Sequence, residues 1–592
     1  MFNSLPEMFF MRAAEKGEKT VVMRKVNGRW EEISWKKLAD DARDLASGFI
    51  DLGIQPGEKV AILSNNRYEW MLTDIAAHSV QAIDVPIYAT NTPAQVEYIL
   101  RDSESVAIVT EDQEQLNKVL QIRENVPKLK YVITVEGKGD GVLSFYDLLE
   151  RGKHAGHHKE VEERIRKINK EDLATIIYTS GTTGEPKGVM LTHNNLISDV
   201  VGTYEVVKSL LEKEVMLAFL PWTHSFGRTV DLYLGAYHGE GIMAIAESIQ
   251  KVPENIQEIK PTMFASVPRI FEKIYTKIIS EVEQGPALKK KIFYWALNVG
   301  RKWAKYNLEG KPVSFLLEIQ RSIADKLVFS KVREALGGRL KFTASGGGPL
   351  SKELGEIFYA MGIKIIEGYG LTETSPVVTV NPPDRPKYGS IGKPIPGAQL
   401  KIAEDGEILI KGPMVMKGYY NKPEATREAI DEEGWFHSGD IGRVDEEGYY
   451  YITDRKKDII VTAGGKNIAP QPIENKLKLN RFIEQVVVIG DRRPYCVALI
   501  QPDFEELKAY AQEKGISYTD IKELLDKPEV RNLFQEAVDE VNKDLPRYST
   551  IKKFELIPEP LTPESGELTP TLKVKRWRVE EKYRDLVEKM YS

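Results

Sequence analysis

Apolar and polar positions in the first third of the chain follow two alternating periods. Short apolar runs such as KVAIL (59–63) and AIDVPI (82–87) are typical of buried strands, whereas EWMLTDIAAHSV (69–80) between them has helical spacing. A second helix is expected after the turn residues at 91–93, and VAIVTE (106–111) is expected to form the next strand. This repetition predicts an α/β fold with doubly wound, mainly parallel sheets.

The same strand pattern returns at 173–180, 340–347 and 363–370, and it changes after Pro376. Over about 376–452, short segments rich in Gly, Pro and β-branched residues predict a small β-barrel.

A compact charged segment, DRKKD (454–458), precedes further strand and helix patterns. We place a domain boundary there, because a chain of 592 residues exceeds the ~250–300 residues at which single cores stop growing. We therefore expect a large N-terminal part (1–453) followed by a small α+β C-terminal domain (454–592).

Composition and charge narrow the class of protein. Hydrophobic residues make up 42% and charged residues 29% of the chain, as in ordinary soluble enzymes. A net charge of −6 gives no basic field that would attract nucleic acid. The single cysteine, Cys496, excludes an intrachain disulfide and favours a reducing compartment. The first residues lack a signal-peptide pattern and no apolar run approaches ~18 residues, so we expect a cytoplasmic protein.

One segment departs from this acidic background. Residues 284–341 contain thirteen Lys and Arg against four Asp and Glu, a net charge of +9, with aromatic and aliphatic residues between them. We favour a helical insertion that packs its apolar face on the main domain and leaves a solvated basic face. The alternative is peripheral contact with the anionic inner face of a membrane.

The stretch YTSGTTGEPKG (178–188) has the composition of a phosphate-binding loop. Its glycines let backbone N–H groups approach a ligand, its hydroxyls add donors and Lys187 adds a cation. It follows a predicted strand and precedes a predicted helix (193–200), where phosphates are commonly bound. It is not a kinase-type P-loop, because Gly184 is followed by Glu-Pro-Lys. Taken alone, it could equally be a surface loop.

YTSGTTGEPKGVMLTH resembles the phosphate loop of the adenylate-forming superfamily, which contains acyl-CoA synthetases, luciferases and adenylation domains. Further segments resemble the other signatures of that superfamily in the same order: SGGGPL (345–350), EGYGLTET (367–374), GWFHSGD (434–440), DRKKDIIVTAGGKNIAPQPIE (454–474) and LTPTLKVKR (568–576). Within the superfamily the chain is most similar to long-chain fatty acyl-CoA synthetases. The segments that carry this likeness are PWTHSFGR (221–228), ENIQEIKPTMFASVPRIFEK (254–273) and LTPTLKVKR.

The resemblance implies an ATP-dependent, AMP-forming ligase. Such an enzyme joins a fatty acid to the α-phosphate of ATP, releases pyrophosphate and then transfers the acyl group to CoA. The implied partners are fatty acid, ATP with Mg²⁺, and CoA as co-substrate. Because two anions meet in the first step, cationic and N–H groups must stabilise the charge of the transition state.

The resemblance also assigns roles to single residues. Glu373 and Thr179 would hold Mg²⁺ through oxygen ligands, Asp440 would accept the ribose hydroxyls, and Lys573 would bridge the carboxylate and the phosphate. The implied ATP and AMP contacts are Thr179, Ser180, Gly181, Thr182, Thr183, Gly184, Lys187, Gly346, Gly347, Gly348, Tyr369, Gly370, Thr372, Glu373, Asp440 and Arg455. Taken singly, most of these could be capping, core or surface residues; as an ordered set they favour the site.

The second step implies a mobile C-terminal domain. Lys457 falls at the hinge position of the family, Gly464 and Gly465 would face the CoA tunnel, and His224 would gate it; a core histidine is the alternative for His224. This chain departs from the family twice. Leu572 stands where a glycine is common, which makes Lys575 an alternative to Lys573, and Val461 stands where a lysine is common.

Two other functions are compatible with this resemblance. An acyl-AMP ligase would pass its product to a carrier protein, and a catalytically dead descendant would bind fatty acid alone. The retained Lys187, Glu373, Asp440, Arg455 and Lys573 disfavour the dead descendant, which has no physical need of them.

Overall fold

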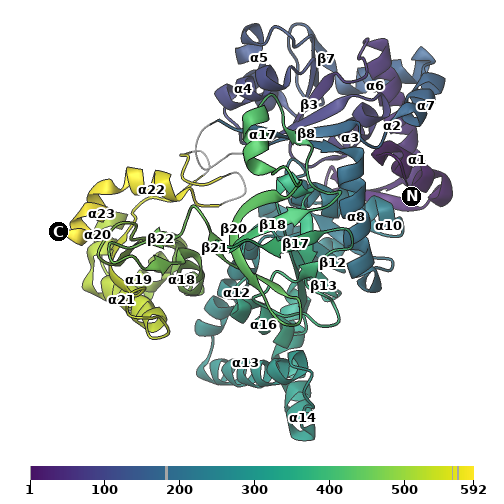
Figure 1. Cartoon of the computed structure of the whole chain (residues 1–592). Coiled ribbons are helices and arrows are strands. Elements are labelled where there is room, and N and C mark those ends of the chain that lie inside the picture. The colour runs from purple at the N-terminus through teal and green to yellow at the C-terminus, as the bar shows by residue number, and fades with distance from the viewer. Residues whose placement is uncertain (1, 180–184, 563–564, 570–572) are drawn as a thin grey trace.

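The computed structural model describes residues 2–179, 185–562, 565–569 and 573–592. Figure 1 shows a large body that ends in a smaller C-terminal domain lying at its side. In the described residues, the body contains two large sheets in which most neighbouring strands run parallel. The predicted fold class, α/β with doubly wound sheets and a separate C-terminal domain, is therefore confirmed.

The two sheets of the body are built from segments far apart in sequence. In spatial order, one sheet contains β19 (Gly418–Tyr419), β9 (Lys187–Thr192), β8 (Leu173–Thr179), β4 (Ile83–Ile87), β3 (Lys59–Leu63), β5 (Ala107–Thr110), β6 (Tyr131–Thr134) and β7 (Val142–Ser144). The other contains β16 (Lys393–Pro394), β15 (Val377–Val380), β14 (Lys364–Gly370), β13 (Phe342–Ser345), β12 (Met263–Ser266), β10 (Val215–Ala218), β11 (Ile242–Ile245), β1 (Thr20–Val26) and β2 (Arg29–Ser34).

A core of apolar residues lies between these sheets. Successive side chains of β3 point alternately into this core and into a second one. Val60 and Ile62 face this core, while Ala61 and Leu63 face a second core on the other side of the sheet. Strands buried on both faces read as continuous apolar runs, as KVAIL does.

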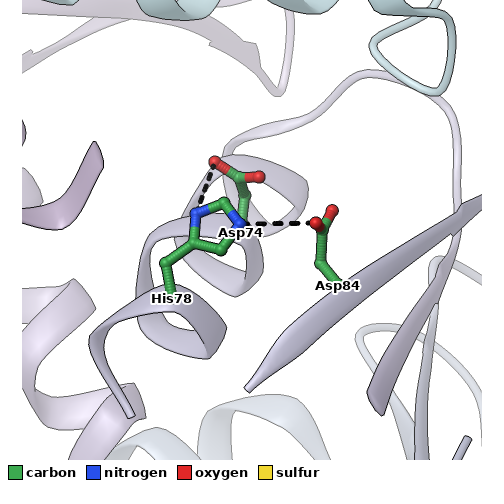
Figure 2. A group of neighbouring side chains, drawn as sticks. All are labelled: Asp74, His78 and Asp84. Atoms are coloured by element: carbon green, nitrogen blue, oxygen red, sulfur yellow. Dashed lines mark ion pairs between the residues drawn. The ribbon is translucent and has the colours of Figure 1, made fainter. Parts of the chain in front are cut away.

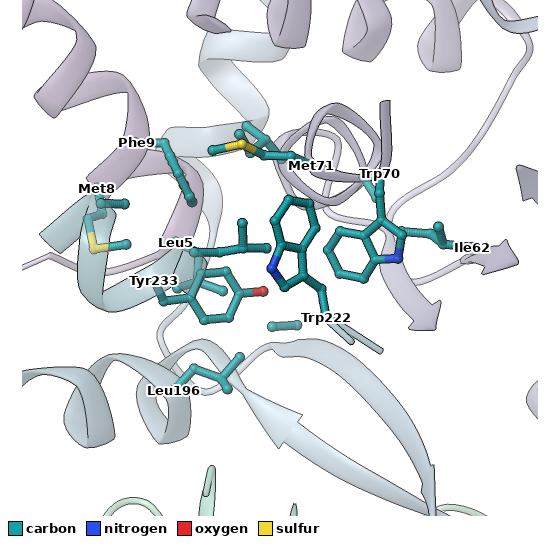
Figure 3. Packing of buried hydrophobic residues seen from close by; sticks show 14 of the residues in the cluster. Leu5, Met8, Phe9, Ile62, Trp70, Met71, Leu196, Trp222 and Tyr233 are labelled. Carbon is teal, nitrogen blue, oxygen red and sulfur yellow. The ribbon is translucent and has the colours of Figure 1, made fainter. Parts of the chain in front are cut away.

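The central core also holds helices α1 (Leu5–Lys16), α3 (Tyr68–Ser79) and α8 (His193–Val207). Figure 3 shows Trp70 of α3 beside Trp222, and their ring centroids lie 5.7 Å apart in an edge-to-face arrangement. Such aromatic pairs stabilise a core beyond the area that they bury. The pair fixes the chain just before the segment that carries His224.

The segment after the phosphate loop differs from the prediction. The helix expected over 193–200 is present as α8, but the residues before it, Lys187–Thr192, form the unpredicted strand β9, which pairs antiparallel with β8. Only then does α8 begin, at His193, with Thr192 as its N-cap. The described residues on either side of the loop thus belong to two paired strands, β8 and β9. The short apolar run 189–191, which is typical of a strand, was the overlooked signal.

A smaller antiparallel sheet follows within the stretch that we predicted as a barrel. It contains β17 (Gln399–Ile402), β18 (Glu407–Lys411), β20 (Phe436–Val444) and β21 (Tyr450–Arg455). The neighbouring strands β15, β16 and β19 join the large sheets instead. The small sheet thus lies between the body and the C-terminal domain in sequence, and its last strand leads into that domain.

The C-terminal domain is built on a three-stranded sheet that helices cover on both faces. Its strands are β24 (Ile483–Ile489), β25 (Cys496–Pro502) and β26 (Ile551–Leu556). One face packs on α18 (Pro470–Leu477), α19 (Phe504–Lys514), α20 (Ile521–Asp526) and α21 (Pro528–Asn542). The other face packs on α22 (Arg576–Lys582) and α23 (Arg584–Tyr591).

The basic segment forms α13 (Ala287–Leu308) and α14 (Phe315–Ala324). Helix α13 buries Phe293 and Leu297 in a core that it shares with α12 (Pro268–Glu283) and α16 (Lys352–Ala360). Helix α13 therefore packs its apolar face on the main domain, as we predicted for the basic segment. Helix α14 instead lies at the lower end of the molecule in Figure 1, and several of its apolar side chains are exposed. In the described part of the chain, every helix is too short or too polar to span a bilayer.

Candidate functional site

Asp440 lies where strands of the body and of the small sheet meet. It stands opposite Arg455 in the pairing of β20 with β21, and Arg455 Nε lies 3.2 Å from Asp440 Oδ1. Tyr369, near the end of β14, donates its hydroxyl to Asp440 Oδ2 at 2.7 Å. Burial raises the pKa of the Asp440 carboxyl, and the charge of Arg455 and the bond from Tyr369 oppose this shift. The same contacts hold the ring of Tyr369 in place.

Glu373 lies beside the ends of the phosphate loop. It belongs to the 3₁₀ turn Thr372–Thr374, and its Oε1 accepts a hydrogen bond from the Tyr419 hydroxyl at 2.9 Å. The Nζ atom of Lys187 lies 4.9 Å from the centre of the Tyr419 ring. Thr179 pairs with Lys187 across the β8–β9 hairpin. Tyr419 thus links the predicted metal ligand to the predicted phosphate-binding lysine.

The middle of that loop is outside the described residues. The predicted contacts that fall there are Ser180, Gly181, Thr182, Thr183 and Gly184.

Lys573 comes from the C-terminal domain and faces these groups of the body. Burial, together with the charge of Arg455, lowers the pKa of Lys573 to about 8, while Asp440 and Glu373 act in the opposite direction. As a whole residue, Lys573 is exposed to solvent. The alternative, Lys575, lies at the N-cap of α22, where its N–H donates to the Glu567 carbonyl at 2.7 Å.

His224 caps the short helix α9 (Ser225–Gly227) near the same site. Its Nδ1 accepts a hydrogen bond from the Phe226 N–H at 3.1 Å, so a neutral ring carries its proton on Nε2. Burial and then the charge of Lys573 lower the pKa of His224 to about 3. The Oγ of Ser225 lies 3.3 Å from Thr372 Oγ1. This segment therefore contacts the turn that carries Glu373.

Gly346 of the predicted adenine loop lies against this segment, whereas Gly347 and Gly348 lie near Val267 and Pro268. A Cβ atom on Gly346 would come within 3.0 Å of the Phe226 ring, and Gly347 has a left-handed φ of 75°. Gly348 follows directly and is partly exposed. At Gly370 a Cβ would lie 1.5 Å from the Pro376 carbonyl oxygen, so the backbone there admits glycine alone.

The predicted hinge and CoA residues lie in exposed turns. Lys457 is exposed in a turn closed by the bond from the Asp458 N–H to the Arg455 carbonyl at 2.9 Å. Gly464 and Gly465 form an exposed turn between β22 (Ile460–Val461) and β23 (Asn467–Ile468). Among the described residues, a Cβ on Gly465 would meet no atom within 4 Å. In this arrangement of the two domains, the turn at Gly464 and Gly465 is therefore exposed to solvent.

Ion pairs between α12 and the C-terminal domain fix how the two parts face each other. Arg269 pairs with Glu484 of β24, and Lys273 Nζ lies 3.3 Å from the same carboxylate. Farther along α12, the Ser280 hydroxyl donates to Glu506 at 2.8 Å. These contacts hold the orientation in which Lys573 faces Asp440. No sequence motif indicated them, because the partners are more than 200 residues apart in the chain.

A buried charged cluster lies beneath the segment that carries His224. Figure 2 shows His78 between Asp74 and Asp84, with its Nε2 3.3 Å from Asp84 and its Nδ1 3.9 Å from Asp74. Arg228 forms ion pairs with both aspartates, and its Nη1 donates to Thr175 at 2.9 Å. The guanidinium therefore neutralises the carboxylates that a metal would need. The cluster instead anchors Arg228 to the sheet of β4 and β8.

Comparisons with known proteins agree with this geometry. The AMP-binding enzyme family matches residues 9–420, and the C-terminal domain family of AMP-binding enzymes matches residues 457–592. The chain is 37% identical to the long-chain-fatty-acid–CoA ligase FadD15 of Mycobacterium bovis, over 100% of this chain and 97% of that protein. It is 33% identical to the peroxisomal long chain acyl-CoA synthetase 7 of Arabidopsis thaliana, over 95% of this chain and 82% of that protein.

A solved structure shows the same fold. The adenylation domain of a carboxylate reductase from Mycobacterium chelonae superposes with a TM-score of 0.78 at 22% identity, covering 99% of this chain and 91% of that one. The family match, the full-length relatives and the ordered motifs lead to one conclusion: the chain belongs to the AMP-binding enzymes, the adenylate-forming superfamily that its motifs resemble.

Proposed function

We propose that the protein is an ATP-dependent, AMP-forming ligase that converts a long-chain fatty acid into its CoA thioester. The observation that carries this proposal is the placement of Lys573, from the C-terminal domain, beside Asp440 and Glu373 of the body. The names of the full-length relatives support a long-chain fatty acid as substrate and CoA as the acyl acceptor.

In the first half-reaction, a carboxylate oxygen of the fatty acid attacks the α-phosphorus of ATP. The bond to the bridging oxygen breaks, and pyrophosphate leaves with the bonding electrons. Lys573 is mostly protonated below its pKa of about 8, and its ammonium group would lie between the two anions. Asp440 would accept the ribose hydroxyls, since each carboxylate oxygen keeps a lone pair besides the bond it already accepts. Tyr369 would stack on adenine.

The residues at the loop ends fit a Mg²⁺ ion. Glu373 uses Oε1 for Tyr419, which leaves its second oxygen for a cation, and Thr179 offers a hydroxyl oxygen. Such hard oxygen donors suit Mg²⁺, which would supply neutralisation of phosphate charge when bound. Lys187 would add a second cation at the β- and γ-phosphates.

In the second half-reaction, the sulfur of CoA attacks the acyl carbon, and AMP leaves as the C–O bond to its phosphate breaks. We propose that the C-terminal domain first turns about Lys457, which would remove Lys573 from the site. Gly464 and Gly465 would then face the pantetheine arm, and the neutral ring of His224 would gate its path. The ion pairs of Glu484 with α12 would have to break in this turn.

Two features of the sequence support a location for the protein in the cell. The single cysteine supports a cytoplasmic location. The basic segment 284–341 supports peripheral attachment to the inner face of the membrane.

Product analysis tests this function. Purified protein with ATP, Mg²⁺ and palmitate should release one pyrophosphate for each bound acyl-adenylate, and CoA should convert this burst into steady turnover to palmitoyl-CoA. Turnover that requires an acyl carrier protein in place of CoA would support the carrier-loading alternative. Palmitate binding without pyrophosphate release would contradict a ligase of either kind.

A further inference from the structure

Helix α14 presents an ordered apolar ridge to solvent. Three of its exposed side chains, Phe315, Ile319 and Ile323, recur at every fourth position. Leu316 lies beside them, and Leu327 continues the spacing in the helical segment that follows α14 (Asp325–Phe329). Residues four apart lie on one face of a helix, so these side chains form a single surface. Phe315 is 82% exposed and Leu316 65% exposed, values that side chains of this size rarely keep in a folded domain.

The opposite side of α14 is firmly held. Arg321 stacks on the ring of Trp303 of α13 at 5.1 Å and pairs with Asp325 at 2.9 Å. The Trp303 indole donates to Glu318 at 3.2 Å, and Ala324 is fully buried. These contacts fix the rotation of the helix about its axis. The apolar ridge therefore points outward because of the fold itself.

The neighbouring helix α13, which contacts α14, carries basic side chains. Lys289, Lys291, Arg301, Lys302 and Lys305 of α13 are exposed, and none of them has an ion-pair partner among the described residues. On the exposed face of α13 they alternate with large apolar side chains, of which Leu288 and Trp295 are examples. The surface thus combines unpaired positive charge with apolar and aromatic side chains.

We propose that α13 and α14 form a docking surface for an anionic lipid bilayer. Phe315, Leu316 and Ile319 would enter the boundary between headgroups and acyl chains, and the cations of α13 would contact lipid phosphates. Exposed Trp295 suits the interfacial depth, where aromatic rings are enriched. A second copy of the chain is disfavoured as the occupant, because it would bring a segment of charge +9 against another of +9.

This surface rests on the membrane attachment proposed above and names the residues that would make it, but it is separate from the proposed reaction. Helices α13 and α14 contribute none of the proposed ATP, Mg²⁺ or CoA contacts. Loss of membrane binding and loss of ligase activity are therefore separate outcomes that can be measured independently.

Vesicle binding by the full chain tests the proposal. We expect the protein to sediment with vesicles of phosphatidylcholine and phosphatidylglycerol and to bind pure phosphatidylcholine at least about tenfold more weakly. The triple variant Phe315→Ser, Leu316→Ser, Ile319→Ser should bind the anionic vesicles at least about tenfold more weakly than the parent chain. Added salt should weaken the binding of the parent chain.

Two further variants sharpen the test. The charge variant Lys291→Gln, Lys302→Gln, Lys305→Gln should lose its preference for anionic vesicles. Ile249→Ser, which changes a comparably exposed side chain (51%) on another part of the body, should bind as the parent chain does. All variants should keep the far-ultraviolet circular dichroism of the parent chain and its turnover of palmitate in the absence of vesicles.

Three results would overturn the proposal. The parent chain could fail to bind anionic vesicles, or the triple variant could bind them unchanged. Sedimentation velocity could also show that the parent chain is a dimer and the triple variant a monomer, which would assign the ridge to self-association.

Discussion

Both oxygens of Asp440 are engaged within the protein, one by Arg455 and one by Tyr369. These bonds orient the carboxylate while leaving lone pairs for a ligand. The sequence predicted the identity of these residues through their motifs. It could not predict the bond from Tyr369 to Asp440, because the two residues belong to different sheets and are 71 positions apart.

Asp440→Ala should weaken the use of ATP more than it weakens the fold. Hydrogen bonds to a charged group contribute about 1.5–3 kcal/mol, so kcat/KM for ATP should fall by roughly 10–100-fold. Arg455 can regain water because it is exposed, so the free energy of unfolding should change little. Asp440→Asn keeps the shape of the side chain and removes its charge, so it serves as the control for a change of shape. An unaltered KM for ATP would show that Asp440 does not hold the ribose.

Lys573 should set the alkaline limit of adenylation. The pKa of this lysine lies below the usual 10.5, at about 8, so it loses its charge as pH rises through about 8. In single-turnover assays of pyrophosphate release, kcat/KM for ATP should fall above that pH, since this ratio reports the free enzyme. Lys573→Arg should remove the alkaline decline, because guanidinium stays charged.

Lys573→Ala is the companion test. This variant should lose roughly 10²–10³-fold in adenylation but keep thioester formation from supplied acyl-AMP. If Lys575→Ala has that phenotype instead, the catalytic lysine is Lys575.

At the scale of elements, the strands and helices of residues 59–110 were predicted to within about two residues. These elements could be predicted because each has one clear period and is bounded by turn residues. The strands among them are buried on both faces of their sheet and so form short apolar runs. The strand β9 was missed because it is only six residues long and merges with the loop before it. Tyr419 was missed for a related reason: it sits in a two-residue strand whose sheet partner, β9, was itself not predicted.

Gly370, between β14 and the turn that carries Glu373, should tolerate no side chain. A Cβ at Gly370 would overlap the Pro376 carbonyl oxygen at 1.5 Å, so Gly370→Ala must displace backbone. We expect a loss of about 2–3 kcal/mol in the free energy of unfolding, measured with urea. Gly368→Ala, two residues earlier, is the matched control, because its nearest atom beyond its chain neighbours lies at 3.4 Å. Equal stability of the two variants would contradict this account of the junction.

At the scale of the molecule, the site depends on how two domains meet. The motifs predicted that Lys573 serves the first half-reaction, but its position depends on how the C-terminal domain packs on the body, where Arg269 and Lys273 of α12 form ion pairs with Glu484 of β24. Those charges carry no local signal, because Arg, Lys and Glu are ordinary surface residues in any helix or strand. A change in these pairs should therefore affect one half-reaction and spare the other.

Glu484→Lys should separate the two half-reactions. Glu484 binds Arg269 and Lys273 in the present arrangement, so a lysine there would place three cations together and disfavour it. We expect pyrophosphate release in a single turnover to slow by roughly tenfold, since a partly buried pair is broken. Thioester formation from supplied acyl-AMP should be unchanged or faster, because the proposed turn of the domain breaks the same contacts.

A charge exchange provides the control for that variant. In Arg269→Glu, Glu484→Arg the attraction between the two domains returns, so at least part of the lost adenylation rate should return with it. Glu272 and Lys273 keep their original charges, so recovery should be incomplete. Far-ultraviolet circular dichroism and the urea midpoint show whether both domains stay folded. If Glu484→Lys slows both half-reactions equally while the fold is intact, these ion pairs do not select the adenylating arrangement, and the orientation of Lys573 must be held by other contacts.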